Sequence, residues 1–249
     1  MAIDLHTPDP EETPTWIPRK SAPTLTEGGL HLWRIPVGHP DPAKGQVLEA
    51  CLTMLGKYQR ARAQRMSQTA TRERYVQAQA GLRQVLGLYL EVSPKSLVFG
   101  YGPVGKPFLE GAPRGFEFNL TTADDLALVG ISLGSPLGVD CERIRPRRGL
   151  TGIAQRMFEP ERAAAIAALP EREALAAFYR SWTALEADAK ADGRGLFRAR
   201  PPGAEPPEIR HCVPARGFIA AVARAKVPPL SSWRTLQLGQ ESRVEAILY

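Results

Sequence analysis

The stretch WTALEADAKADGRGL, residues 182–196, has the pattern of a helix up to Gly193, where a glycine-rich tail begins. Residues four apart lie on the same side of a helix, so Trp182, Glu186 and Lys190 form a row. A glutamate four residues before a lysine also stabilises a helix by roughly a few tenths of a kcal/mol. The row is therefore explained either by an ordinary ion pair beside a buried tryptophan, or by an acid and a base that face a ligand.

A second acidic motif, GVDCERI (138–144), precedes this helix. Successive side chains of a strand point to opposite faces, so Asp140 and Glu142 share one face and Val139 and Cys141 the other. Two carboxylates on one face repel each other unless solvent separates them or a cation bridges them. Hard divalent ions such as Mg²⁺ bind to paired acids of this kind and keep waters and phosphate oxygens as further ligands. The alternative is a solvated face whose acids pair with the arginines that follow.

Together the two motifs offer a third metal ligand. Glu186 would join Asp140 and Glu142 at one Mg²⁺, while Lys190 would neutralise a phosphate or handle a proton.

Composition and targeting signals restrict the class of protein. The chain has 249 residues, 43% hydrophobic and 23% charged, as expected for a folded protein of one large or two modest domains. It contains no run of about 18 apolar residues, so we expect no membrane partner. The start, MAIDLHTPDPEETPTW, does not resemble a secretory signal, and the three cysteines have no metal-ligand spacing. We expect a reduced, cytoplasmic protein.

The net charge of +6 favours a polyanionic partner. Between residues 57 and 83 there are seven basic residues and one acid, Glu73. Nucleic acid, a phosphorylated small molecule and an acidic protein all fit this charge. The chain has no zinc-finger cysteines and no RNA-binding aromatic motif, so we expect no nucleic-acid partner.

Hydrophobic periodicity predicts a mixed order of strands and helices. Strands are expected at residues 30–37, 116–120, 126–132, 137–144, 218–224 and 242–249. Helices are expected at 43–66, at 71–90 and in a block that ends near 192, and turn-rich or irregular segments at 99–109 and 198–217. This order indicates an α+β fold rather than a regular alternation around a parallel sheet.

We expect three parts along the chain. Residues 1–27 would be an extended or flexible segment, residues 28–115 an N-terminal subdomain, and residues 116–249 a C-terminal subdomain that carries the metal ligands. Each subdomain would be a small, mainly antiparallel sheet packed on a long helix.

In this context the two acidic motifs resemble the paired signature of the 4′-phosphopantetheinyl transferases of the larger, pseudo-dimeric, Sfp-like class. Their pattern is roughly G-[IV]-D-x-E, then W-[ST]-x-[KR]-E-[AS]-x-x-K-x-x-G-x-G-[LF]. Flanking segments also resemble this family, in the same order: LHLWRIP (30–36), RERYVQAQAGLRQVLG (72–87), GKPFL (105–109) and FNLTTADDLALVGIS (118–132). The similarity covers roughly residues 30–225 and implies the fold of that family.

The resemblance implies a Mg²⁺-dependent transferase. Such enzymes move the 4′-phosphopantetheine group of coenzyme A to a serine of an apo acyl or peptidyl carrier protein and release adenosine 3′,5′-bisphosphate. The partners would be coenzyme A and an acidic carrier protein, and we expect a monomer. The alternative is a homologue that binds coenzyme A or carrier proteins without catalysis.

The resemblance also assigns residues. Asp140, Glu142 and Glu186 would hold Mg²⁺ against the pyrophosphate of coenzyme A, and Lys190 would contact the phosphate under attack or help to deprotonate the serine. The other coenzyme A ligands would be Lys106 and Pro107 at the adenylate end, Arg74 and Arg62 at the 3′-phosphate, and Thr121 and Thr122.

The chain departs from the family pattern in three places. Thr121 and Thr122 stand where the family has Ser and His, and threonine carries no charge. Leu185 stands where the family has a basic residue. The acid after RMF is displaced, so that Glu161 is the candidate for the acid that deprotonates the serine; the alternative is an ordinary glutamate in the first turn of a helix.

Overall fold

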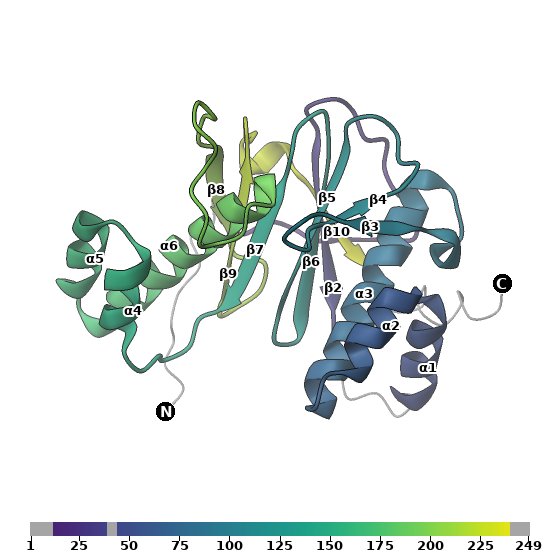
Figure 1. Cartoon of the computed structure of the whole chain (residues 1–249), viewed down its shortest axis with the longest axis horizontal. Helices are drawn as coiled ribbons and strands as arrows, with labels where there is room; N and C mark the ends of the chain where they lie inside the picture. Colours follow the sequence, from purple (N-terminus) through teal and green to yellow (C-terminus); the bar gives the residue numbers. More distant parts are fainter. Residues whose placement is uncertain (1–11, 39–43, 240–249) are drawn as a thin grey trace.

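The computed structural model describes residues 12–38 and 44–239 and shows an α+β protein with two sheets (Figure 1). The larger sheet has the strand order β1 (Ile17–Arg19), β10 (Arg234–Leu238), β2 (Leu30–Pro36), β6 (Leu126–Leu133) and β5 (Phe116–Ala123). The smaller sheet has the order β7 (Gly138–Arg143), β9 (Phe218–Arg224) and β8 (Glu208–Cys212). The predicted fold class is confirmed.

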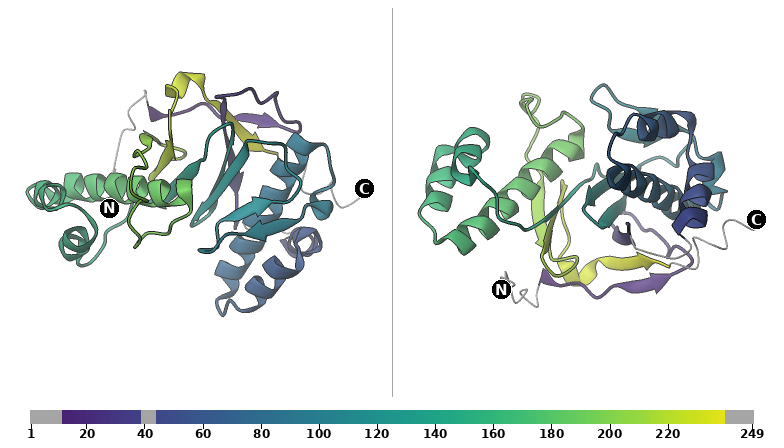
Figure 2. Two further views of the ribbon diagram at one scale, coloured as in Figure 1. Left: turned by 45° about the horizontal axis from the view of Figure 1, so that its top comes forward. Right: turned by 90° about the horizontal axis from the view of Figure 1, so that it is seen from below.

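The larger sheet is mixed. β2 pairs with β6 and β6 with β5 in antiparallel fashion, whereas β1 pairs with β10 and β10 with β2 in parallel. Figure 2 shows the strands from the two ends of the chain, β1 and β10, side by side. All pairs of the smaller sheet are antiparallel.

A long helix packs on each sheet. α3 (Thr69–Leu90) covers the larger sheet through a core that includes Leu82, Val85 and Leu86, and α1 (Lys44–Met54) and α2 (Lys57–Gln64) lie beside it. α6 (Glu171–Asp192) covers the smaller sheet, and α4 (Leu150–Met157) and α5 (Pro160–Ala167) pack on its N-terminal half. α1–α3 and α4–α5 therefore occupy opposite ends of the long axis (Figure 1).

The two sheets meet at their edge strands, β5 and β7. Asn119 on β5 accepts a hydrogen bond from the main-chain N–H of Val139 on β7 at 2.9 Å. A buried cluster that contains Leu128, Val139 and Cys141 continues from one sheet to the other. The acidic motif thus lies on the strand where the two sheets join.

Several expected elements differ in detail. The helix expected at 43–66 is two helices, because the chain leaves the helical conformation at Gly56, which has an extended ψ of 168° and precedes α2. The turn-rich segment 99–109 contains a hairpin of β3 (Phe99–Tyr101) and β4 (Pro107–Leu109). The irregular segment 198–217 contains β8.

The ends of the chain also differ from the expectation. Residues 17–19 of the expected extended segment form β1, and residues 1–11 lie outside the described residues. Strand β10 was not predicted, and the strand expected at 242–249 lies outside the described residues. The expected subdomain boundary at 115/116 does not coincide with the sheets, because β5 and β6 belong to the larger sheet. Short 3₁₀ helices, Pro94–Ser96 and Leu230–Ser232, complete the described elements.

Candidate active site

Gly138 lets helix α6 lie directly on strand β7. A Cβ at this position would come within 1.9 Å of the carbonyl oxygen of Ala187 and 2.5 Å of the nitrogen of Ala191, both main-chain atoms of α6. Ala187 and Ala191 form a buried cluster with alanines of β9. The small residues bring the acidic face of β7 against the turn of α6 that carries Glu186 and Lys190.

Asp140 is the most buried of the three predicted acids, with 3% of its surface exposed. Its Oδ1 accepts hydrogen bonds from Lys190 Nζ at 2.6 Å and from Thr121 Oγ1 at 3.1 Å. Its Oδ2 is buried and has no hydrogen-bond partner among the described residues. Burial raises the pKa of Asp140, while the ammonium of Lys190 acts in the opposite direction. The free oxygen is a vacant acceptor for a donor or a cation.

The negative charge of Asp140 acts on both Glu142 and Glu186. Burial, followed by the charge of Asp140, raises the pKa of Glu142 to about 7, and Glu186 contributes to this shift. Burial also raises the pKa of Glu186, and Asp140 adds to the shift. The three acids thus disfavour one another's ionised forms, which is the electrostatic condition that a divalent cation relieves.

The predicted three-ligand geometry is not formed by these side chains as they stand. In the part of the chain that the structure describes, no three His, Cys, Asp or Glu side chains are grouped closely enough to hold one metal ion. Lys190 instead pairs with Asp140. The donor set nevertheless fits Mg²⁺ in its chemistry, because it consists of carboxylate oxygens and leaves Asp140 Oδ2 without a partner.

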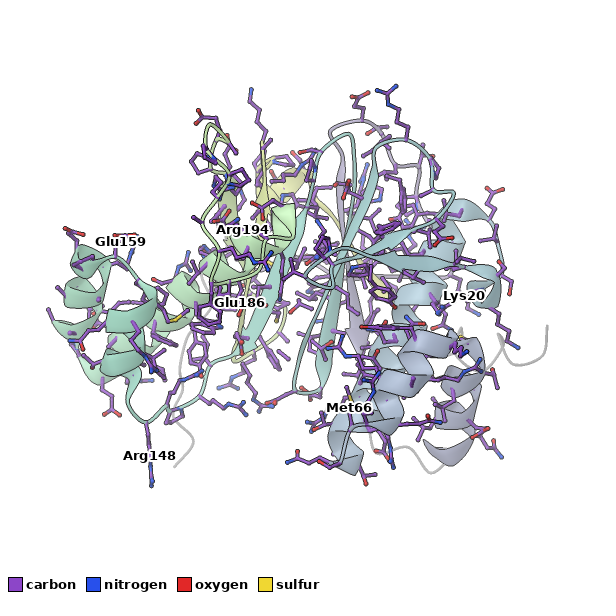
Figure 3. The ribbon with its side chains drawn as sticks, viewed as in Figure 1. Lys20, Met66, Arg148, Glu159, Glu186 and Arg194 are labelled. Atoms are coloured by element: carbon purple, nitrogen blue, oxygen red, sulfur yellow. The ribbon has the colours of Figure 1, made fainter. Side chains whose placement is uncertain are left out.

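A cavity of about 510 Å³ lies beside these acids. It is lined by α2, α3, the β3–β4 hairpin, β5 and the end of α6, namely by Tyr58, Arg62, Tyr75, Gln79, Leu82, Tyr101, Val104, Gly105, Lys106, Pro107, Asn119, Leu120, Thr122, Glu186, Ala189, Lys190, Gly193, Gly195 and Leu196. Its size is in the range typical of small-molecule sites. Glu186 and Lys190 of α6 form part of its wall. Figure 3 shows Glu186 near the middle of the molecule.

Four of the other predicted residues also line this cavity: Arg62, Lys106, Pro107 and Thr122. Arg74 is not among the lining residues and lies on α3 next to Gly38. The Nζ of Lys106 donates hydrogen bonds to main-chain carbonyls, at 2.6 Å to Ala191 O and 3.3 Å to Leu137 O. Of the cations predicted to bind the nucleotide, Arg62 and Lys106 line the cavity, and no carboxylate among the described residues forms an ion pair with either; Lys106 Nζ is bonded to main-chain carbonyls, whereas Arg62 lies over the ring of Tyr75.

Thr121 and Thr122 have different positions. Thr121 is buried and donates its hydroxyl to Asp140, so it orients an acid rather than lining the cavity. Thr122 is exposed and lines the cavity. The alternation along strand β5 is the reason, because adjacent side chains point to opposite faces.

Glu161 does not join the other predicted residues. It lies exposed in the first turn of α5 and is absent from the cavity wall. Figure 3 shows its near neighbour Glu159 at the end of the molecule, far from Glu186. Trp182, the first member of the helical row, stacks on Phe178 with a centroid distance of 6.0 Å and packs, half-buried, against the core beneath α4 and α5.

The sequence reasoning missed three tyrosines. Tyr58, Tyr75 and Tyr101 line the same cavity as Glu186, and the ring centroids of Tyr58 and Tyr101 are 4.1 Å apart. The guanidinium of Arg62 lies 5.5 Å from the centre of the Tyr75 ring. Burial raises the pKa of Tyr75 to about 12 and also raises the pKa of Tyr101, so these two rings stay neutral. They come from α2, α3 and β3, and no spacing in the sequence links them.

The sequence comparisons link the chain to one family. The profile of the 4′-phosphopantetheinyl transferase superfamily matches residues 136–239, which include both acidic motifs. The 4′-phosphopantetheinyl transferase HetI of Nostoc sp. is 35% identical over 186 residues, which cover 74% of this chain and 77% of HetI.

Two further relatives match over a smaller part. The 4′-phosphopantetheinyl transferase AcpT of Salmonella typhi is 41% identical over 100 residues, 39% of this chain and 50% of AcpT. The 4′-phosphopantetheinyl transferase gsp of Aneurinibacillus migulanus is 26% identical over 133 residues, 50% of this chain and 54% of gsp.

Among residues 12–38 and 44–239, no helix is long and apolar enough to cross a membrane. The α+β fold, the paired acidic motifs beside one cavity and the 35% identity to HetI over 77% of its length lead to one conclusion: the chain belongs to the 4′-phosphopantetheinyl transferase superfamily.

Proposed function

We propose that this protein transfers the 4′-phosphopantetheine group of coenzyme A to a serine of an apo carrier protein and releases adenosine 3′,5′-bisphosphate. The observation that carries the proposal is the cavity of about 510 Å³, whose wall combines Glu186 and Lys190 with Arg62 and three tyrosines. An acidic, reactive end and a cationic, aromatic end suit a ligand with a diphosphate at one end and a nucleotide at the other.

The two ends of the cavity have different tasks in this proposal. Tyr58 and Tyr101 offer aromatic faces, and Arg62 offers a charge for a phosphate of the nucleotide. Lys190 lines the cavity from α6, where its ammonium would neutralise the phosphate under attack after breaking its ion pair with Asp140. Arg74 lies outside the wall, so we assign the phosphate contact to Arg62 first.

Asp140, Glu142 and Glu186 would hold a Mg²⁺ ion in this proposal. When bound, the ion would neutralise charge on the diphosphate and orient it, as metals do in phosphoryl transfer. The support is the free Oδ2 of Asp140 and the raised pKa of Glu142 and Glu186. The side chains of the two glutamates have to turn toward Asp140 to share one ion, because they do not converge as they stand.

The serine proton needs an acceptor close to the reacting phosphate. Glu186 is the carboxylate among the described residues that line the cavity, and a carboxylate oxygen of Glu186 that does not bind the ion would accept the proton. In the proposed step the serine oxygen forms a bond to the phosphorus next to the pantetheine. The bond from that phosphorus to the bridging oxygen breaks, and adenosine 3′,5′-bisphosphate leaves with the electron pair.

The arrangement also supports the larger, pseudo-dimeric class and a monomeric enzyme. The long helices α3 and α6 have 22 residues each and cover one sheet apiece, and residues from both parts of one chain line the cavity. A second copy is therefore not needed to complete it. The net charge of +6 supports an acidic carrier protein as partner.

The test is intact-mass analysis of several apo carrier proteins incubated with this protein, coenzyme A and Mg²⁺. We expect one phosphopantetheine to be added to at least one carrier, Glu186→Ala to abolish the addition, and Glu173→Ala, an exposed change on the same helix, to leave it intact. Unmodified carriers together with retained coenzyme A binding would point to the non-catalytic homologue. Loss of coenzyme A binding as well would contradict both functions.

A further inference from the structure

Lys106 makes its closest polar contacts with the protein main chain. Its Nζ donates hydrogen bonds to the carbonyl of Ala191 at 2.6 Å and to that of Leu137 at 3.3 Å. No carboxylate of the described residues lies within ion-pair distance of it. Burial lowers the pKa of Lys106, and Glu117 and Asp192 act against this shift from further away.

The two carbonyls belong to the elements of the active site. Ala191 lies in the last turn of α6, one residue after Lys190, and Leu137 directly precedes β7 with its acids. The last carbonyls of a helix have no partner within the helix and carry partial negative charge, so a cation stabilises them. The ammonium of Lys106 supplies this partner from the β3–β4 hairpin.

The aliphatic part of the Lys106 side chain also packs on the end of α6. A Cβ on Gly193 would come within 3.1 Å of its Cδ, and a Cβ on Gly195 would come within 3.1 Å of Val104 Cγ1. Both glycines also have positive φ, 69° and 81°. The tip of the hairpin therefore packs directly on the glycine-rich segment that follows α6.

We infer that Lys106 is a positioning residue that pins the β3–β4 hairpin to the end of α6, rather than a ligand of the nucleotide. The hairpin supplies Tyr101, Val104 and Pro107 to the cavity wall, and α6 supplies Glu186 and Lys190. The contacts of Lys106 thus fix the position of the hairpin relative to α6 before any ligand binds.

The test is hydrogen–deuterium exchange of the free protein, without coenzyme A or a carrier. In Lys106→Met we expect amides of the hairpin, residues 99–109, and of the α6 end, residues 191–197, to exchange at least tenfold faster. Lys106→Arg should restore part of the protection, since it keeps the charge and the donors. Lys95→Met, at an exposed lysine outside the cavity, is the matched control and should match the wild type.

Helices α4 and α5 serve as an internal reference, because unchanged exchange there shows that the variant has folded. If exchange of 99–109 and 191–197 is the same in Lys106→Met as in the wild type, the inference is wrong. A salt-dependent loss of coenzyme A binding without any change in exchange would identify Lys106 as a direct ligand.

A second experiment, which rests on the proposed function, measures steady-state kinetics. A loosened cavity wall should raise KM for coenzyme A severalfold in Lys106→Met, and Lys106→Arg should recover part of it. The exchange experiment needs neither coenzyme A nor turnover. It therefore tests the positioning role of Lys106 separately from the proposed function.

Discussion

The carboxylate of Asp140 has two unlike oxygens. Oδ1 accepts from Lys190 and Thr121, whereas the buried Oδ2 has no partner among the described residues. An acceptor without a donor costs free energy in a protein interior unless a ligand satisfies it. This asymmetry explains why Thr121 is best regarded as a support for Asp140 and not as a contact to coenzyme A.

Thr121→Val tests that support. The change keeps the shape of the side chain but removes the hydrogen bond to Oδ1, and a bond to a charged group contributes roughly 1.5–3 kcal/mol. We expect kcat to fall by about tenfold, which is roughly 1.4 kcal/mol, with a smaller change in KM for coenzyme A. Steady-state kinetics check this, and Thr122→Val should affect KM more than kcat. A Thr121→Val enzyme with unchanged kcat would show that Asp140 does not need the support.

The raised pKa of Glu142 predicts how metal-free stability depends on pH. Its pKa is about 4.5 in the unfolded chain and about 7 in the folded one, so the folded state binds more protons between these values. Stability should therefore be greatest at the acid end of this window and should fall as the pH rises toward 7, by at most about 1.4 kcal/mol per pH unit for one proton. Asp140 and Glu186, whose pKa values are also raised, act in the same direction.

Urea denaturation in EDTA at several pH values measures this dependence. Glu142→Gln should flatten the fall between pH 4.5 and 7, because the residue no longer titrates. An equally steep fall in Glu142→Gln would assign the slope to other groups.

For single residues, the sequence predicted which side chains take part in the site better than it predicted which groups they contact. The alternation of GVDCERI correctly placed Val139 and Cys141 in the core and Asp140 opposite them. It gave no means to tell that Lys106 turns to two carbonyls. A side-chain contact with the main chain of a distant element leaves no pattern in the sequence, whatever the residue type.

At the scale of elements, the packing of α6 on β7 determines where the acids lie. The small residues at this contact, Gly138 and Ala187 among them, allow main chain to lie against main chain. A larger side chain at position 138 would push the helix away and carry Glu186 and Lys190 with it.

Gly138→Ala tests this contact. The new Cβ would overlap main-chain atoms of α6, which cannot rotate away, so we expect a loss of roughly 3 kcal/mol or more in the free energy of unfolding. Activity of the protein that still folds should also fall. The control is Gly152→Ala in α4, where a Cβ meets nothing within 4 Å and should stabilise the helix by about 0.5–1 kcal/mol. Equal stability of the two variants in chemical denaturation would argue against close packing of α6 on β7.

The long elements were predictable, and the short ones were not. The periodicity of α3 and α6 extends over 22 residues in each, so local irregularities such as Gly87 did not hide them. β8 and β10 have five residues each, and β8 follows a segment rich in proline. Short strands are held by their partners in the sheet, which the local sequence does not reveal.

At the scale of the whole molecule, the site depends on the junction of two sheets. Asn119 and Thr121 on β5 reach across to Val139 and Asp140 on β7, and the cavity takes its walls from both parts. The α+β class followed from the order of the elements. The boundary expected at residue 115 misses the junction, because β6 pairs with β2 and β5 pairs with β6. Such long-range pairing is not visible in hydrophobic periodicity.

We propose that three acids, remote from one another in the sequence, hold one divalent ion together with coenzyme A. Electron paramagnetic resonance of Mn²⁺, used in place of Mg²⁺, measures this directly in the presence of coenzyme A. We expect one bound ion per wild-type chain, affinity reduced at least tenfold in each of Asp140→Asn, Glu142→Gln and Glu186→Gln, and wild-type affinity in Glu173→Gln. Wild-type Mn²⁺ affinity in all three acid variants would contradict the claim.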